Sequence, residues 1–239
     1  MKRHAKRVKR IDRETILEIV NSENFNGRVS SMDQAEMAIP SYLHQNPFIR
    51  EILWRRYEKV YNLAPSIAGM TVCEFGCGIG AFLPTLAKAA EKVYAVDLFP
   101  QYAEALAKRL DLDVTFSKDM AEIPDNSLDI LFAVEVMEHL DNPDVFTNLF
   151  ARKLKPGGHL IMSGPTESWF YKFGRFLIGY NKYHDYHEFN AYQLRRIIAE
   201  NGFQIIKTIR FPSPILPLFL ICDFLVDKNN GGREKRSGE

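Results

Sequence analysis

The stretch VCEFGCGIGAF, residues 72–82, decides the fold class of this chain. It has the pattern of a buried strand that ends at Phe75, a turn with three glycines, and the start of a helix. Glycine accepts backbone conformations with positive φ and lets a ligand approach the main chain closely. In a doubly wound sheet such a turn lies at the carboxyl end of the first strand, beside the point where the strand order reverses. The stretch therefore predicts an α/β fold with a ligand site at this turn.

Short apolar segments alternate with amphipathic ones along most of the remaining chain. The segments predicted as strands are 70–75, 92–97, 113–117, 128–134, 159–163 and 203–211. Before them, Asn46-Pro47 has the pattern of an N-cap followed by proline at the first position of a helix, which we expect to run to about Leu63. Alternating strands and helices are typical of βαβ units, so the pattern predicts a mostly parallel sheet.

Length and composition limit the choice of protein class. The chain has 239 residues, of which 46% are hydrophobic, and this suits one α/β domain with a single core. Its three cysteines form neither a disulfide framework nor a zinc pattern, which favours a reducing compartment and a cytoplasmic protein. No segment reaches the roughly 20 apolar residues of a membrane span.

Charge is distributed unevenly, although the net charge is only +1. Residues 1–13 carry seven basic side chains and one acidic one, and the rest of the chain has a net charge of −5. Such an arm either contacts an anionic membrane or nucleic acid, or is a solvated and frayed chain end. We expect the solvated state, and the nearly neutral total argues against nucleic acid as a partner. The predicted parts are a basic arm, 1–23; a helical segment, 24–66; the main domain, 67–227; and a disordered tail, 228–239.

Two classes of adenosine cofactor fit the glycine turn. Gly76, Gly78 and Ala81 match the relaxed dinucleotide fingerprint, which would make the protein an NAD(P)-dependent oxidoreductase. Glu74 argues against that class, because a carboxylate two residues before the first glycine repels a pyrophosphate and suits a cation, such as an ammonium group beside a sulfonium. Asp97 ends the second strand and can accept both hydroxyls of a ribose in either class.

Three later motifs favour the second class: Ser117-Lys118-Asp119-Met120, the fourth strand with its exit at 129–140, and the Lys-Pro-Gly-Gly turn at 155–158. With these in order, residues 68–211 resemble the class I S-adenosylmethionine-dependent methyltransferases, and within them the small-molecule and lipid-precursor group that is similar to methyltransferase type 11. The resemblance implies a Rossmann-like, doubly wound, seven-stranded sheet with a reversed last strand. We expect N-terminal helices to accompany it.

The resemblance also implies a set of residues that hold S-adenosylmethionine and its product S-adenosylhomocysteine. Those at the methionine end are Glu74, Phe75, Gly76, Cys77, Gly78 and Gly80. Asp97 would bind the ribose, and the adenine would lie beside Leu98, Asp119 and Met120, with Met120 packed on the ring. Asp119 could equally cap the helical turn that follows it. Glu135 begins the exit of the fourth strand, where cofactor and acceptor meet.

The acceptor side is less sharply defined by the sequence. His139 is a candidate general base, because imidazole accepts protons near neutral pH, or it merely borders the pocket. The aromatic-rich insertion 165–190 follows the fifth strand, and in it Tyr171, Tyr183, His184 and His187 are candidate acceptor-binding residues. The order of histidine and glutamate at 183–188 does not match a zinc protease motif, so no metal is expected.

These features predict an enzyme that transfers a methyl group, most readily to oxygen, on a small-molecule, glycan or lipid-linked acceptor. The alternatives are the NAD(P)-dependent oxidoreductase and a module that binds S-adenosylmethionine without turnover. The apolar run 215–222 is expected to form a sheet edge and a short packed helix, or else to dip into a membrane interface. In the second case the protein would be peripheral at an anionic membrane.

Overall fold

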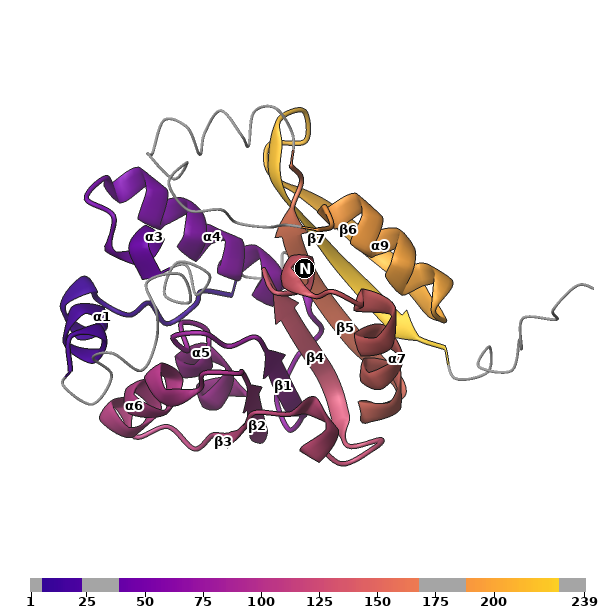
Figure 1. Cartoon of the computed structure of the whole chain (residues 1–239), viewed down its shortest axis with the longest axis horizontal. Coiled ribbons are helices and arrows are strands. Elements are labelled where there is room, and N and C mark those ends of the chain that lie inside the picture. Colours follow the sequence, from indigo (N-terminus) through magenta and orange to yellow (C-terminus); the bar gives the residue numbers. More distant parts are fainter. Residues whose placement is uncertain (1–5, 23–38, 168–187, 228–239) are drawn as a thin grey trace, which may run out of the picture.

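The computed structural model describes residues 6–22, 39–167 and 188–227 (Figure 1). The predicted tail 228–239 and four candidate acceptor residues, Tyr171, Tyr183, His184 and His187, lie outside the described residues. The limits proposed between the arm, the helical segment and the main domain stay predictions.

A seven-stranded sheet in the order β3-β2-β1-β4-β5-β7-β6 forms the centre of the molecule. Its strands are β1 (Thr71–Phe75), β2 (Lys92–Val96), β3 (Thr115–Ser117), β4 (Leu128–Val134), β5 (Leu154–Pro165), β6 (Phe203–Pro212) and β7 (Pro217–Val226). The first five strands are parallel, and β7 is antiparallel to both of its neighbours. The predicted doubly wound sheet with a reversed last strand is confirmed.

The expectation for the apolar run 215–222 is wrong in its main part. Residues from Pro217 onward form β7, which lies inside the sheet between β5 and β6 rather than at its edge, and residues 215–222 contain no helix. Leu220, Ile221 and Cys222 are fully buried, as expected for an inner strand covered on both faces. Only the turn before Pro217 is exposed, and it lies at the carboxyl edge of the sheet because β6 runs parallel to β1.

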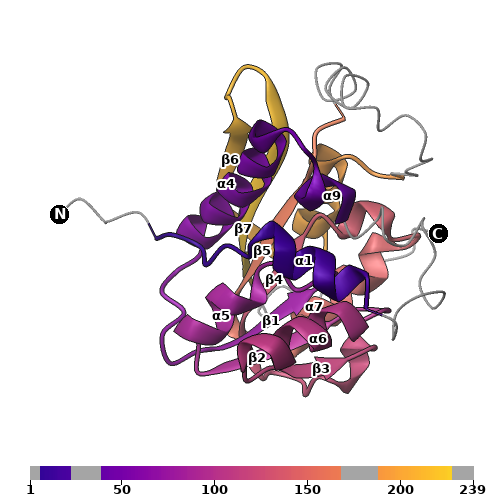
Figure 2. The same ribbon diagram turned by 90° about the vertical axis from the view of Figure 1, so that its left-hand side faces the viewer.

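Helices cover both faces of the sheet, as Figures 1 and 2 show. The helices are α1 (Arg13–Val20), α3 (Ile39–Leu43), α4 (Pro47–Leu63), α5 (Leu83–Ala89), α6 (Gln101–Leu110), α7 (Pro143–Lys153) and α9 (Ala191–Glu200), with short 3-10 turns η1 (Met120–Glu122) and η2 (Met137–His139). One buried apolar cluster joins the first face to α1, α4, α5 and α6, and a second joins the other face to α7 and α9. Within the described ranges, no helix is long and apolar enough to cross a membrane.

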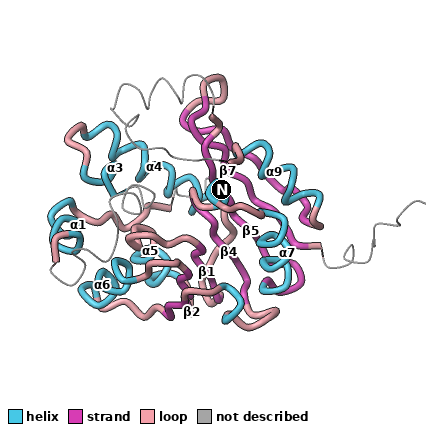
Figure 3. The backbone as a smooth tube through the Cα atoms, in the orientation of Figure 1, coloured by secondary structure: helices cyan, strands magenta, loops and turns pink. Residues whose placement is uncertain are grey.

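Helix α4 begins where the sequence predicts. The Asn46 side chain accepts a hydrogen bond from the backbone N–H of Phe48 at 2.9 Å, and Pro47 takes the first helical position. The helix contacts β5, β6 and β7 and packs in the apolar cluster that also holds α1, α5 and α6; Figure 3 shows it next to α3. An element that precedes the first strand therefore covers part of this face of the sheet.

The N-terminal arm is not a solvated chain end over its described part, which corrects our expectation for residues 6–13. The Lys6 ammonium donates to the carbonyls of Ala64 and Pro65 and lies 4.7 Å from the centre of the Tyr61 ring. The backbone N–H of Lys9 donates to Thr85 on α5 at 2.8 Å. Because these partners are more than 50 residues away in sequence, the charge pattern alone could not reveal them.

Candidate cofactor and acceptor site

The glycine turn has the backbone that its sequence requires. Gly76, Gly78 and Gly80 all have positive φ, at 73°, 51° and 79°. A Cβ on Gly76 would lie 2.3 Å from Cγ2 of Val136 at the exit of β4, so only glycine fits there. A Cβ on Gly80 would lie 3.1 Å from the Cβ of Ala103 on α6. Two of the three glycines therefore have packing reasons that are independent of any ligand.

Asp97 links the end of β2 to this turn. One carboxylate oxygen accepts a hydrogen bond from the N–H of Gly78 at 2.7 Å, and the other accepts one from the N–H of Phe99 at 2.9 Å. Each oxygen keeps a further lone pair, so the carboxylate can still accept ribose hydroxyls. Asp97 therefore also stabilises the conformation of the glycine turn.

Glu74 is the most informative residue of the site. Its side chain is 1% exposed, and its Oε2 has no hydrogen-bond partner among the described residues. Burial, assisted by the negative charge of Asp97, raises the pKa of this carboxyl well above its ordinary value. A buried carboxylate without a partner is costly unless a cation pairs with it. The site therefore fits a ligand that carries an ammonium group, as S-adenosylmethionine does.

Two side chains assigned to the methionine end lie in the core instead. The Phe75 ring packs 5.0 Å from the ring of Phe150 on α7. Cys77 is buried on the other face, and burial raises the pKa of its thiol well above the ordinary value. Only the main chain of these two residues is available to a ligand. Their part in holding the cofactor stays a prediction, through backbone contact.

Of the three residues predicted beside the adenine, Leu98 is exposed, whereas Asp119 and Met120 have roles in the structure itself. Leu98 is 73% exposed at the carboxyl end of β2, so it is available to an adenine ring. The Asp119 carboxylate accepts from the N–H of Ala121 at 2.8 Å and caps η1, and a role toward adenine stays a prediction. Met120 is 1% exposed and packs in the core, so the expectation that it packs on the ring is corrected.

A buried polar cluster at the exit of β4 was only partly visible in the sequence. Arg56 on α4 is buried, with Nη1 3.5 Å from Oε2 of Glu135 and its guanidinium 5.0 Å from the Phe219 ring centre. Burial alone would lower the pKa of Arg56, but the charges of Glu135, of two neighbouring tyrosines and of Glu138 together outweigh this and raise it. Ser163 on β5 donates to the other oxygen of Glu135. Both oxygens of Glu135 are thus engaged within the protein, so its contact with the cofactor stays a prediction.

The backbone at this exit is unusual. Glu135 has a φ of +54°, which is uncommon for a residue other than glycine and often marks functional sites. Glu138 follows in η2, is 1% exposed, and its Oε2 has no hydrogen-bond partner among the described residues. Burial and the charge of Glu135 raise the pKa of Glu138 well above its ordinary value. His139 is next to it and half-buried.

The residues predicted from sequence did not include Arg56, Glu138 or the two tyrosines that feel the charge of Glu74. Tyr42 and Tyr57 lie with their hydroxyl oxygens 3.2 Å apart, and the charge of Glu74 helps burial to raise the pKa of both. Tyr57 also stacks on Phe82, directly after the glycine turn, with ring centres 5.0 Å apart. A signal for Arg56 was present, because it falls on the same helical stripe as the apolar core residues of α4.

Comparison with known proteins agrees with this geometry. A family model described as "Methyltransferase domain" matches residues 43–208. The chain is therefore a member of the methyltransferase-domain family, which places it among the class I S-adenosylmethionine-dependent methyltransferases.

Individual relatives are more distant. A probable S-adenosylmethionine-dependent methyltransferase from Mycolicibacterium smegmatis is 32% identical over 178 residues, which cover 73% of this chain and 66% of that protein. A ubiquinone biosynthesis O-methyltransferase from Xanthomonas oryzae pv. oryzae is 31% identical over 104 residues, or 41% of this chain and 44% of the relative. The matches thus span about half to two thirds of these relatives.

A solved structure shows the same fold. The N-methyltransferase NodS from Bradyrhizobium japonicum WM9, in complex with S-adenosylhomocysteine, superposes with a TM-score of 0.61 at 19% identity. The superposition covers 82% of this chain and 97% of NodS. At this identity the likeness concerns the fold alone.

Proposed function

We propose that this chain transfers a methyl group from S-adenosylmethionine to an oxygen of a small-molecule, glycan or lipid-linked acceptor. The observation that carries the proposal is the buried, unpartnered Oε2 of Glu74 beside the glycine turn. It supports a cofactor with a cationic end, whereas the pyrophosphate of NAD(P) would meet a carboxylate there. The same observation disfavours the oxidoreductase alternative.

In this proposal the residues of the chain bind and orient the two reactants. Glu74 pairs with the ammonium group, Asp97 accepts from the ribose hydroxyls, and Leu98 lies beside the adenine. When bound, S-adenosylmethionine supplies an electrophilic methyl group on a positively charged sulfur. Because that charge disperses during transfer, a dry site with aligned reactants is the main requirement. Tyr57 and the rest of the inner face of α4 help to exclude water above the turn.

A hydroxyl acceptor must lose its proton, and the exit of β4 offers two groups for this. Glu138 is almost fully enclosed, and its ionised form is opposed by Glu135. His139 is half-buried, so it is the group that can both reach an acceptor and exchange protons with solvent. We therefore keep His139 as the proposed base.

The relatives include methyltransferases of both oxygen and nitrogen. Ubiquinone biosynthesis enzymes, O-methyltransferases by name, are 25–31% identical, and a phosphoethanolamine N-methyltransferase from Triticum aestivum is 33% identical over 126 residues. Oxygen is the proposed acceptor atom because O-methyltransferases recur among these relatives. A module that binds the cofactor without turnover is the second candidate. Methyl transfer can proceed by proximity and alignment alone, so the lack of a catalytic group would not distinguish such a module from an enzyme.

The test is turnover with a labelled methyl donor. We expect the purified chain to transfer label to one of four extract fractions, which contain lipids, glycans, small molecules or RNA, and we expect the lipid, glycan or small-molecule fraction to take it. The labelled product should resist conditions that demethylate nitrogen but not those that cleave ethers or esters. Tight binding of S-adenosylhomocysteine without transfer to any fraction would favour the binding module, and label in RNA would contradict the proposed acceptor class.

A further inference from the structure

The outer face of α4 carries a stripe of residues outside the cofactor site, of which Ile52 also packs against the core. Phe48, Ile52, Arg55 and Lys59 follow at intervals of four, three and four residues, so they share one side of the helix. They line a groove of about 1030 Å³ between α4, the N-terminal arm and the end of β6. Arg56 and Tyr57 point to the opposite, buried side. The groove is therefore separate from the cofactor site.

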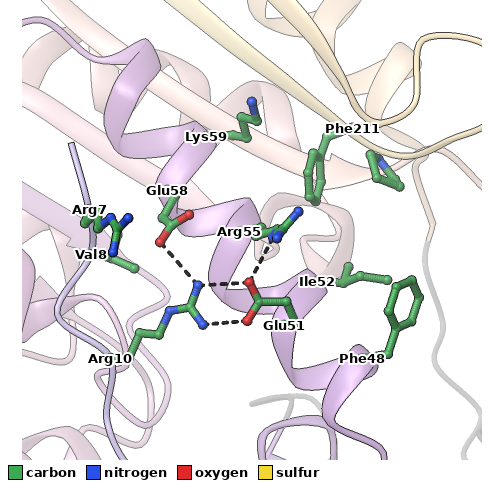
Figure 4. A pocket seen from close by; sticks show the side chains of 11 residues that line it. Arg7, Val8, Arg10, Phe48, Glu51, Ile52, Arg55, Glu58, Lys59 and Phe211 are labelled. Carbon is green, nitrogen blue, oxygen red and sulfur yellow. Dashed lines mark hydrogen bonds and ion pairs between the residues drawn. The ribbon is translucent and has the colours of Figure 1, made fainter. Parts of the chain in front are cut away.

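One end of this groove is apolar and open. Figure 4 shows Phe48, Ile52 and Phe211 gathered there. Phe48 is 68% exposed. Pro212 also lines the groove and leads into the β6–β7 turn, in which Ile215 is 88% exposed and Leu216 is half-exposed. Three of the large apolar side chains that the described residues leave in solvent thus belong to one edge of the molecule.

The other end is basic. Arg10 is held by Glu51 at 2.5 Å and Glu58 at 3.3 Å, and Arg55 is held by Glu51 at 2.8 Å (Figure 4). The groove has four cationic and two anionic side chains, so a positive charge of two remains. Within the described part of the chain, no ion pair engages the exposed Arg7 or Lys59. No described residue therefore competes with an anionic partner for these two side chains.

We propose that this surface docks the protein on an anionic lipid bilayer. Exposed phenylalanine, isoleucine and leucine beside unpaired arginine and lysine are the pattern of an interfacial contact, in which apolar groups enter the headgroup region and cations meet anionic lipid. The surface keeps only part of the one predicted from sequence. Arg7 of the arm and Ile215 and Leu216 of the apolar run belong to it, whereas Lys6 and Arg10 bind the protein itself and residues 219–222 are buried in β7.

The position of the surface relates membrane docking to the active site. The β6–β7 turn and the glycine turn both lie at the carboxyl edge of the sheet. A protein docked through Phe48 and Ile215 therefore holds its active site near the bilayer. This consequence rests on the proposed function, and it narrows the acceptor to a lipid-linked or membrane-dissolved molecule.

Vesicle flotation of the full chain tests the docking without any turnover. We expect co-flotation with vesicles of phosphatidylcholine and phosphatidylglycerol, little with phosphatidylcholine alone, and release as salt rises from about 0.05 M to about 0.5 M. Ile215→Ser lies in an exposed turn. This variant and Lys59→Glu should each lower the partition coefficient between vesicles and water by about tenfold. Both should keep the thermal stability and S-adenosylhomocysteine affinity of the wild type.

The matched control is Val145→Ser, which removes another exposed apolar side chain, 64% exposed, from α7 on the other face of the sheet and should float like the wild type. Three results would overturn the proposal: no flotation at low salt, an equal loss in the control, or flotation that the two groove variants do not change. A dimer that forms through the groove in sedimentation, without flotation, would assign the surface to a second copy of the chain. Since S-adenosylhomocysteine binding is measured in parallel, failure of docking and failure of the proposed function are distinguishable.

Discussion

Replacing Asp97 by alanine is expected to weaken the binding of S-adenosylhomocysteine by about a hundredfold or more. The carboxylate should accept two charge-assisted hydrogen bonds from the ribose, each worth about 1.5–3 kcal/mol, and every 1.4 kcal/mol is about a factor of ten in affinity. The variant also frees the N–H of Gly78, which Asp97 now holds at 2.7 Å. Isothermal calorimetry measures the loss directly.

Two further variants separate the ribose contact from a general loss of structure. Asp113→Ala removes an exposed carboxylate before β3, at the opposite edge of the sheet, and should bind like the wild type. Asp97→Asn keeps one acceptor oxygen and should fall between the wild type and the alanine variant. Unchanged affinity in Asp97→Ala would show that Asp97 is not the ribose ligand.

Binding of S-adenosylhomocysteine is expected to release a proton, and Glu74→Gln should abolish the release. Without ligand, burial raises the pKa of Glu74 well above its ordinary 4.5, so the folded protein keeps this proton at a pH where an exposed glutamate has lost it. The ammonium group of the ligand favours the ionised form, so the proton leaves on binding. Affinity should therefore rise with pH across the interval between 4.5 and the raised pKa of Glu74.

Calorimetry in two buffers with different ionisation enthalpies counts the protons. Glu74→Gln should release none from this position, lose the pH dependence, and bind about tenfold or more weakly, as expected for one charge-assisted hydrogen bond. Glu138→Gln is the matched control, because Glu138 is equally buried and has a raised pKa but belongs to the β4 exit, so its variant should release the proton like the wild type. Release that persists in Glu74→Gln would disprove the assignment.

The same raised pKa values bear on stability. Glu74 and Glu138 bind protons more tightly in the folded than in the unfolded state. Their contribution to the free energy of unfolding is complete below the ordinary carboxyl pKa and is lost as the pH rises toward the folded values. This is the direction opposite to that of salt-bridged carboxylates such as Glu51, whose pKa is lowered to about 2 by Arg10 and Arg55.

Local pattern was enough to predict the parallel part of the sheet. Strands buried on both faces are short apolar runs, and the turn at Gly76 needs glycine for its own backbone and packing. The local pattern did not predict β7 as an inner strand. The prolines at 212, 214 and 217 interrupt this part of the sequence and suggested a sheet edge instead. The structure instead places two of them at the ends of β6 and β7, where no ladder hydrogen bond is lost within an inner strand.

Only part of the candidate site could likewise be predicted from local sequence patterns. Residues next to the glycine turn, such as Glu74 and Asp97, could be assigned because strand ends in an α/β sheet meet at one edge. Arg56 comes from a helix before the first strand, and its partner Glu135 is about 80 residues further along the chain. Only the tertiary fold brings the two together, and the same holds for the arm that packs on α4.

The central claim is that the glycine turn and Glu74 hold a sulfonium cofactor. A calorimetric titration of the wild-type chain with S-adenosylhomocysteine and, separately, with NAD tests it most directly. We predict a single saturable site for S-adenosylhomocysteine and at least about a hundredfold weaker binding of NAD, since NAD brings no ammonium group for Glu74 and its pyrophosphate disfavours ionisation of that buried carboxyl. Binding of NAD in preference to S-adenosylhomocysteine would contradict the claim.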